Sequence, residues 1–193
     1  GTNSQVLINK TLAHNNLANE QRDQMSFGKA IINYLEALKI APKESDVHSN
    51  LGVAYQEQGD TEQAIFCYIE AIRLDTDNAE AHRNLGMAYL QIGNFNDGWK
   101  EYEWRWKPHH FKSLRRNWSK PRWLGDDVKG KTLLVHCEQG FGDTLQFSRY
   151  LPLVAKKVNR LIVEAPKELV ELLQRISGVD KVVIASTPLP SFD

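Results

Sequence analysis

The segment His48-Ser49-Asn50-Leu51-Gly52 recurs 34 residues later as His82-Arg83-Asn84-Leu85-Gly86, and a looser copy stands 34 residues earlier as His14-Asn15-Asn16-Leu17-Ala18. Small and aromatic residues keep the same period: Ala30, Ala64 and Gly98, then Tyr34, Tyr68 and Tyr102. The small residues allow two helices to approach closely, while Leu and Tyr fill the space beside them. Such a period is typical of helix–turn–helix repeats. We therefore expect helix pairs at 5–21 with 26–40, 45–58 with 61–74, and 79–92 with 95–107.

After Asp127 the pattern changes to short β-branched runs that alternate with helical patterns. Strands are expected at 131–136, 160–164 and 181–185, and helices at 143–157 and 166–176. Strands that alternate with helices over short connections predict a parallel sheet with right-handed crossovers. The expected domains are three repeats over 1–107, a junction over 108–130 and an α/β segment over 131–193. Because the chain ends where a fourth strand–helix unit is expected, we interpret it as part of a longer protein.

Composition limits the classes of partner. The 193 residues carry 24 basic and 24 acidic side chains, so the net charge favours neither nucleic acid nor an anionic membrane as a partner. We expect no nucleic acid partner. No apolar run approaches the roughly 18 residues that span a bilayer. The two cysteines, Cys67 and Cys137, fall in different predicted domains, which favours reduced thiols and a cytoplasmic protein.

The junction concentrates aromatic and basic residues. All five tryptophans lie between Trp99 and Trp123, and the stretch from Lys107 to Arg122 has six Lys or Arg and no acidic residue. Aromatic rings interleaved with cations can stack on single-stranded nucleic acid or on sugars. We favour the alternative that Trp99 and its neighbours Tyr102 and Trp106 cap the last repeat and join it to the α/β segment. Arg and Lys stems would then cover the indole rings.

The repeats also share an asparagine, at Asn16, Asn50 and Asn84, on the first helix of each predicted pair. In arrays of this kind the first helices line the concave surface. An amide side chain carries both a donor and an acceptor, so it can hold a peptide backbone whatever the peptide's side chains are. These residues therefore predict a protein or peptide partner in a concave groove. The alternative is that they bond helix ends or neighbouring repeats.

A histidine precedes each asparagine by two residues, at His14, His48 and His82. Three separate helices would hold these rings too far apart to coordinate one ion directly, so no metal site is expected. We expect the rings to pack between helices instead.

A glycine-containing turn, Gln139-Gly140-Phe141-Gly142-Asp143, joins the first expected strand to its helix. Ligands of α/β proteins bind at this edge of the sheet. Leu145 stands where a dinucleotide fingerprint would have its third glycine, and no Gly-Lys-Ser/Thr follows, so neither that fingerprint nor a phosphate loop is indicated. If the segment did bind a dinucleotide, which we do not favour, Glu164 at the end of the second strand could bind its ribose. Asp143 is either the N-cap of the helix or a general base that takes a proton from a hydroxyl nucleophile.

Three stretches carry a family resemblance: Pro121-Arg-Trp-Leu-Gly125, Gly130-Lys-Thr-Leu-Leu-Val-His136 and Glu138-Gln-Gly-Phe-Gly-Asp-Thr-Leu-Gln-Phe-Ser-Arg-Tyr-Leu-Pro152. They resemble bacterial tetratricopeptide-repeat proteins with a C-terminal glycosyltransferase-like domain, which is similar to the heptosyltransferases. The repeated asparagines resemble the asparagine ladder of the O-GlcNAc transferase solenoid.

The resemblance implies a multidomain α and α/β protein. A tetratricopeptide α–α superhelix would be followed by a partial Rossmann-like parallel sheet, the first lobe of a two-lobed glycosyltransferase B-type fold. By motif match, Asp143 would be the catalytic base, and Gly140, Gly142 and Gln139 would shape the acceptor side. A sugar nucleotide would bind mostly to a second lobe that this chain lacks. We therefore expect no cofactor in this segment and no activity from it alone.

A rival interpretation is a non-catalytic scaffold whose α/β segment serves protein assembly. In either case an unfinished sheet has an open edge, which favours pairing with a second copy of the chain.

Overall fold

The computed structural model describes residues 2–107, 120–138, 140–185 and 188–193. The chain divides into two compact units, residues 1–115 and 116–193, and the boundary falls within the expected junction. Each unit has a hydrophobic core of its own.

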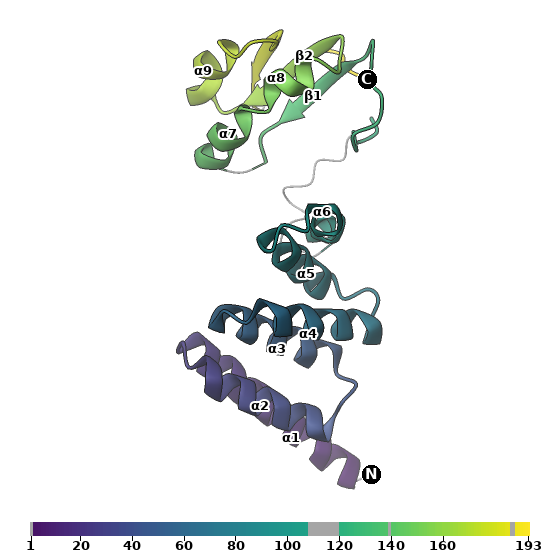
Figure 1. Ribbon diagram of the computed structural model, residues 1–193, viewed down its shortest axis with the longest axis vertical. Helices are drawn as coiled ribbons and strands as arrows, with labels where there is room; N and C mark the ends of the chain where they lie inside the picture. Colours follow the sequence, from purple (N-terminus) through teal and green to yellow (C-terminus); the bar gives the residue numbers. More distant parts are fainter. Residues whose placement is uncertain (1, 108–119, 139, 186–187) are drawn as a thin grey trace. The chain divides into compact units, whose positions relative to one another are not determined.

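The first unit is a stack of three antiparallel helix pairs (Figure 1). The pairs are α1 (Thr2–Asp23) with α2 (Phe27–Ile40), α3 (Ser45–Gln58) with α4 (Thr61–Leu74), and α5 (Ala79–Gln91) with α6 (Phe95–Tyr102). A 3₁₀ helix, η1 (Glu103–Trp106), follows α6. The expected helix pairs are confirmed, except that the last one tightens into 3₁₀ geometry after Tyr102.

Short polar side chains set the helix starts. The side chains of Asp60, Asn78 and Asn94 accept hydrogen bonds from the free backbone amides of α4, α5 and α6. At the other end of α3, Gly59 adopts a left-handed conformation with φ of 97°. Glycine adopts this conformation without steric cost, so the chain can reverse within one residue.

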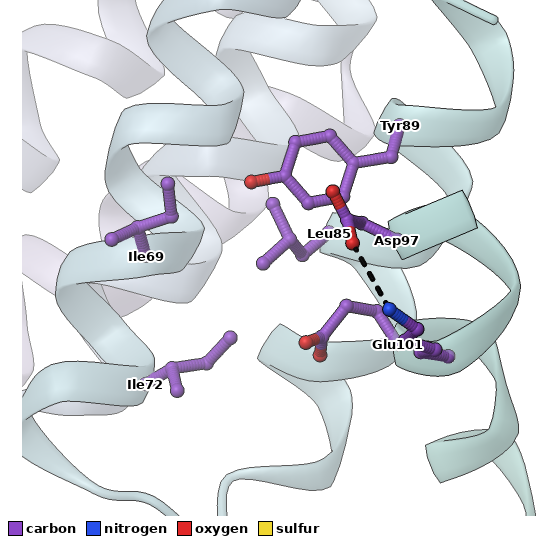
Figure 2. A pocket seen from close by; sticks show the side chains of 7 residues that line it. Ile69, Ile72, Leu85, Tyr89, Asp97 and Glu101 are labelled. Carbon is purple, nitrogen blue, oxygen red and sulfur yellow. Dashed lines mark hydrogen bonds and ion pairs between the residues drawn. The ribbon is translucent and has the colours of Figure 1, made fainter. Parts of the chain in front are cut away.

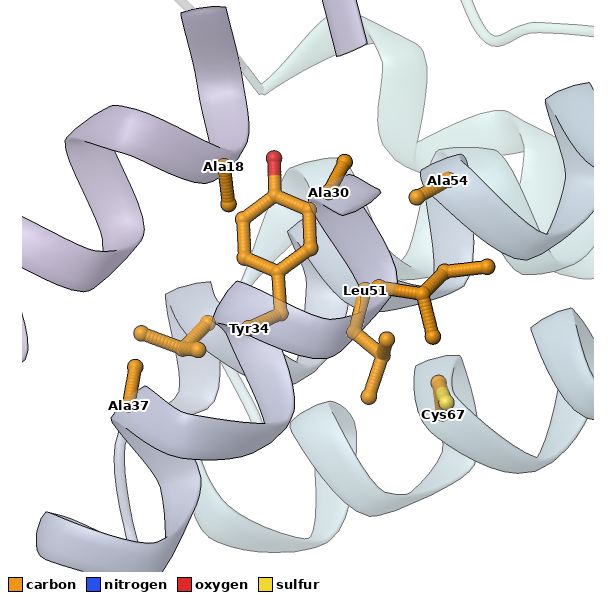
Figure 3. Packing of buried hydrophobic residues seen from close by; sticks show 9 residues of the cluster. Ala18, Ala30, Tyr34, Ala37, Leu51, Ala54 and Cys67 are labelled. Carbon is orange, nitrogen blue, oxygen red and sulfur yellow. The ribbon is translucent and has the colours of Figure 1, made fainter. Parts of the chain in front are cut away.

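Small residues at the repeat positions allow the close packing that the sequence predicts. A Cβ atom added at Gly52 would lie 2.6 Å from Cε1 of the Tyr68 ring, and one added at Gly86 would lie 2.8 Å from Cα of Tyr102. In the first pair, the Tyr34 ring packs between Ala18 and Ala30 (Figure 3). Tyr34 and Tyr68 are fully buried, and burial raises the pKa of both hydroxyl groups.

The second unit is a three-stranded parallel sheet with strand order β1-β2-β3. The strands are β1 (Thr132–His136), β2 (Arg160–Ala165) and β3 (Lys181–Ile184), with Leu134 opposite Ile162 and Glu164 opposite Val183. Leu161, Val163 and Ala165 on one face of the sheet pack against the connecting helices. The parallel sheet is thereby confirmed.

The connections differ in detail from the expected single helices. Two short helices, α7 (Phe141–Ser148) and α8 (Leu151–Ala155), replace the expected helix 143–157. Pro152 lies in the first turn of α8, where its missing amide hydrogen costs least. The second connection is a 3₁₀ turn, η2 (Lys167–Leu169), followed by α9 (Val170–Gln174).

Candidate functional site

The first helices of the three repeats, α1, α3 and α5, form the first candidate surface, which we call the first-helix surface. Each of these helices contacts the next first helix directly. Successive second helices, α2, α4 and α6, contact one another less. Closer approach on one side curves the stack toward that side, so the first helices lie on its inner face.

The three repeated asparagines occupy equivalent positions on this surface but differ in their surroundings. Asn16 is exposed, whereas Asn50 and Asn84 are half-buried. Asn50 donates a hydrogen bond of 3.3 Å from Nδ2 to Oδ1 of Asn15 on the neighbouring first helix. Asn84 accepts one of 3.2 Å from its neighbour Arg83. The bond between Asn50 and Asn15 shows that one of the three takes part in repeat-to-repeat contact.

Two further polar pairs cross between first helices, and sequence reasoning missed both. The Arg22 guanidinium lies 3.9 Å from the Glu57 carboxylate, and Gln56 donates a bond of 3.3 Å to Gln91. Like Asn15 and Asn50, the partners in each pair are 35 residues apart. A search for complementary residues one repeat plus one position apart would have found them.

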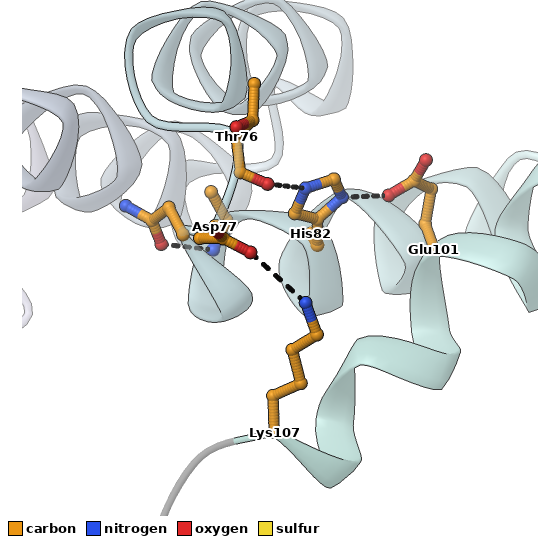
Figure 4. Close-up of polar contacts among 7 residues, drawn as sticks. Thr76, Asp77, His82, Glu101 and Lys107 are labelled. Atoms are coloured by element: carbon orange, nitrogen blue, oxygen red, sulfur yellow. Dashed lines mark hydrogen bonds and ion pairs between the residues drawn. The ribbon is translucent and has the colours of Figure 1, made fainter.

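Two of the repeated histidines, His14 and His82, contact the second helix of their pair, as expected, whereas His48 contacts the loop before its own helix. His14 Nδ1 lies 3.0 Å from Oδ1 of Asn33 on α2, and His48 Nε2 lies 3.0 Å from the carbonyl oxygen of Pro42. His82 is buried and contacts both the Glu101 carboxylate and the carbonyl oxygen of Thr76 (Figure 4). Within the described residues, no group of three or more His, Cys, Asp or Glu side chains is placed to hold a metal ion.

Aromatic and basic side chains cover one another at the end of the last repeat. The Trp104 ring stacks on His82 at 3.7 Å between centroids, and Lys107 Nζ lies 3.3 Å from the centre of the Trp104 ring. Lys107 also reaches Asp77 at 3.2 Å (Figure 4). At the end of the last repeat the described contacts are thus made by Trp104, whereas Trp99 is 51% exposed. The capping role of Trp99, Tyr102 and Trp106 stays a prediction. Residues 108–119, including Trp118, lie outside the described part of the chain.

A pocket of about 280 Å³ lies between helices of the last two repeats (Figure 2). Its apolar walls come from α4 and α5, at Ile69, Ile72, Leu85 and Tyr89. Three charged side chains of α6 complete the lining: Asp97, Lys100 and Glu101. Lys100 pairs with Asp97 at 3.5 Å, and Glu101 contacts His82.

The second unit has a pocket of about 180 Å³ where its three strands end. Among the described residues, eight line it: Cys137, Glu138, Gly140, Phe141, Glu164, Ala165, Pro166 and Ala185. Of the described residues of the turn 139–143, Gly140 and Phe141 belong to this lining, and Gly142 and Asp143 do not. Burial raises the pKa of the half-buried Cys137 thiol, and the bond with Thr144 partly offsets this effect.

Asp143, from the same glycine-containing segment, lies in helix α7. The N-cap of α7 is Gly140, so the expectation that Asp143 is the N-cap is wrong. The helix begins earlier than expected, which places Asp143 in its first turn, exposed and outside the pocket lining. Gly142 lies in the same helix, and Gln139 lies outside the described residues.

Comparisons with known sequences identify the family of the repeats. Residues 18–59 and 55–93 match the family model for the TPR repeat. A segment of 61 residues, 32% of this chain, is 38% identical to Protein FlbA of Caulobacter vibrioides. The match spans only 10% of that protein's length.

Solved structures share the fold of the first unit. The Arabidopsis OM64 TPR domain is 17% identical with a TM-score of 0.51, over 54% of this chain and 86% of that one. The TPR2B domain of yeast Sti1, in a pHsp70 complex, is 18% identical with a TM-score of 0.51, over 55% and 88%.

The first TPR of Spaghetti (RPAP3), bound to the HSP90 peptide SRMEEVD, is 20% identical with a TM-score of 0.50, over 51% of this chain and 79% of that one. Together with the match to the family model, these likenesses establish that the first unit carries TPR repeats.

Among the described residues, none of the helices has both the length and the hydrophobicity that a membrane span requires.

Proposed function

We propose that the TPR repeats bind a protein or peptide partner in extended form along the first-helix surface. The observation that carries this proposal is the recurrence of an amide side chain at one position of α1, α3 and α5. The HSP90 peptide bound by the first TPR of Spaghetti and the pHsp70 complex of the Sti1 TPR2B domain support it as fold-level analogy.

The geometry of Asn50 is compatible with this role. Its bond to Asn15 uses one of its two amide hydrogens, and an amide can make further bonds through the second hydrogen and the oxygen. The bond also fixes the orientation of the side chain before a peptide arrives, which lowers the entropic cost of binding. At about 0.5–1.5 kcal/mol net for each hydrogen bond, three asparagines contribute a few kcal/mol. We therefore expect weak, backbone-directed recognition.

The test is the affinity of a peptide that has been selected from a display library on the intact chain. Replacing both Asn50 and Asn84 with alanine should weaken binding about tenfold or more, because two backbone-directed bonds are lost. Asn96→Ala is the matched control, since Asn96 is exposed on α6. Equal affinity of the double variant and the control would contradict the proposal.

We infer a second role, in sugar transfer, for the α/β unit. The observation that favours it is the pocket at the carboxyl ends of the strands, next to Gly140. Asp143 would take the proton from an acceptor hydroxyl, and a second lobe outside these 193 residues would bind the sugar nucleotide. The rival is a scaffold without catalysis, with the sheet edge available for pairing with a second copy. Two unpaired cysteines support a reducing compartment such as the cytoplasm for either role.

The test of this second role is turnover of a longer protein that contains both lobes. Asp143→Asn should lower the turnover number by about two orders of magnitude, as expected when a general base is removed. Thermal stability should stay unchanged, because Asp143 is exposed. Glu168→Gln, an exposed carboxylate in η2, is the matched control. Full activity of the Asp143 variant would exclude this residue as the base.

A further inference from the structure

Helix α1 exposes the positions that are buried in the other first helices. In α3, Val47, Leu51 and Ala54 are at most 5% exposed and belong to one cluster with residues of α2. The same positions are buried in α5. Their equivalents in α1 are Ala13, Leu17 and Glu20. All three are exposed, and Leu17 is exposed to 44%.

These residues belong to a longer stripe along α1. The helix has 22 residues, against 14 in α3, and extends about two turns before the position where α3 begins (Figure 1). Two residues of this extension, Val6 and Lys10, are also exposed and continue the same line. We call the five residues the α1 stripe: Val6, Lys10, Ala13, Leu17 and Glu20. Spacings that alternate between four and three residues are typical of helices that pair lengthwise with another helix.

Glu20 restricts what can cover the α1 stripe. Its equivalents Ala54 and Ala88 are fully buried, and a carboxylate buried in their place without a cation would be strongly destabilising. Gln24 donates a bond of 3.4 Å to Glu20 but brings no charge. Among the described residues, neither Glu20 nor Lys10 forms an ion pair. A covering helix must therefore offer a cation to Glu20 and an anion to Lys10.

A second copy of α1 meets both requirements. In an antiparallel pair with a two-fold axis at Asn15, Lys10 of each copy stands opposite Glu20 of the other, because both lie five residues from the axis. Leu17 stands opposite Ala13 in the same way, so a large side chain meets a small one. Helix α1 carries two basic and two acidic residues, and the pair therefore has no net charge to oppose association.

We propose that two copies of the chain associate through their α1 stripes, antiparallel about a two-fold axis at Asn15. The interface is isologous, since each copy contributes the same surface. One helix from each copy makes a contact at the low end of specific interfaces. The dimer is therefore weak and forms at micromolar concentrations.

Sedimentation velocity of the intact chain over micromolar concentrations tests the proposal. The unmodified chain should shift from monomer to dimer as its concentration rises. Leu17→Ser should weaken dimerisation about tenfold or more, since a symmetric pair loses the apolar contact twice. Leu172→Ser is the matched control and should change nothing, because this leucine of α9 is similarly exposed, at 49%, and lies outside α1.

Charge reversal tests the antiparallel arrangement. Lys10→Glu and Glu20→Lys should each weaken association about tenfold, because two attractive pairs become repulsive. An equimolar mixture of the two variants should associate as well as the unmodified chain, because the acidic stripe of one variant then faces the basic stripe of the other. Both residues are exposed, so the monomer should keep its thermal stability.

Three results would overturn the inference. The first is an unmodified chain that stays monomeric at every concentration. The second is a dimer that Leu17→Ser leaves unchanged, which would place the interface elsewhere, such as at the sheet edge. The third is a mixture of the two reversed variants that associates no better than either variant alone.

Discussion

At the scale of single residues, the repeat depends on positions where only a small side chain fits. Gly52 faces the Tyr68 ring, and Gly86 faces the backbone of α6 at Tyr102. The sequence showed these positions directly, because the small residues recur with the period of the repeat. It could not show which neighbours press on them, since this depends on how the second helices cross the first.

Gly52→Ala should lower the free energy of unfolding by about 1–3 kcal/mol, because the new methyl group overlaps the buried Tyr68 ring. The control is Gly28→Ala in α2. There a Cβ atom would meet nothing closer than the Gln58 amide at 4.0 Å. Alanine has the higher helix propensity, so the control should keep or raise stability by up to about 1 kcal/mol. Urea unfolding followed by circular dichroism at 222 nm measures both variants.

The residue type of Asp143 did not decide whether this side chain caps the helix. An acidic residue after glycines predicts a helix start, and the expected cap was the aspartate itself. The backbone carbonyl of Gly140 instead accepts bonds from both the amide and the hydroxyl of Thr144, so the helix begins with Phe141. Glycine can cap a helix with its backbone alone. The sequence pattern therefore did not distinguish Gly140 from Asp143 as the N-cap.

At the scale of helices, the connections between repeats do more than reverse the chain. Asn78 caps α5 by accepting a bond of 2.9 Å from the amide of Ala81. Its Nδ2 also donates to Ser45 Oγ at 2.8 Å and to Asp46 at 3.1 Å, both in the first turn of α3. One buried amide therefore links two successive repeats.

Asn78→Ala should lower the free energy of unfolding by about 2–3 kcal/mol, because the variant loses a helix cap and two bonds between repeats. Asn94 is the matched control, since it caps α6 but makes no recorded bond to another repeat within the described residues. Asn94→Ala should cost about 1 kcal/mol, as expected for a cap alone. Equal losses in urea unfolding would show that the bonds between repeats contribute nothing.

The elements of the two units were predictable to different degrees. Three copies of one pattern fixed five of the six repeat helices to within a few residues. The end of α6 was not predicted, because the stacking of Trp104 on His82 is a tertiary contact. In the second unit, Pro152 signals a helix start within the range 143–157, yet the apolar pattern favoured a single helix.

At the scale of the whole molecule, the chain joins a TPR stack to an α/β unit, and each has its own candidate site. Sequence alone predicted the order of the units and the parallel sheet. It did not predict the pocket at the sheet edge as it stands, because Cys137, Pro166 and Ala185 meet only when all three strands are paired. It also missed the polar pairs between first helices, whose partners lie one repeat apart.

The central claim is that the first-helix surface, and not the pocket lined by α4, α5 and α6, holds the peptide. The most direct measurement is a ¹H–¹⁵N correlation spectrum of the backbone and side-chain amides, recorded as a selected peptide is added. We expect the Nδ2 resonances of Asn50 and Asn84 to shift while that of Asn96 stays in place. Shifts confined to residues around Tyr89 and Ile69, with the asparagine signals unchanged, would contradict the claim.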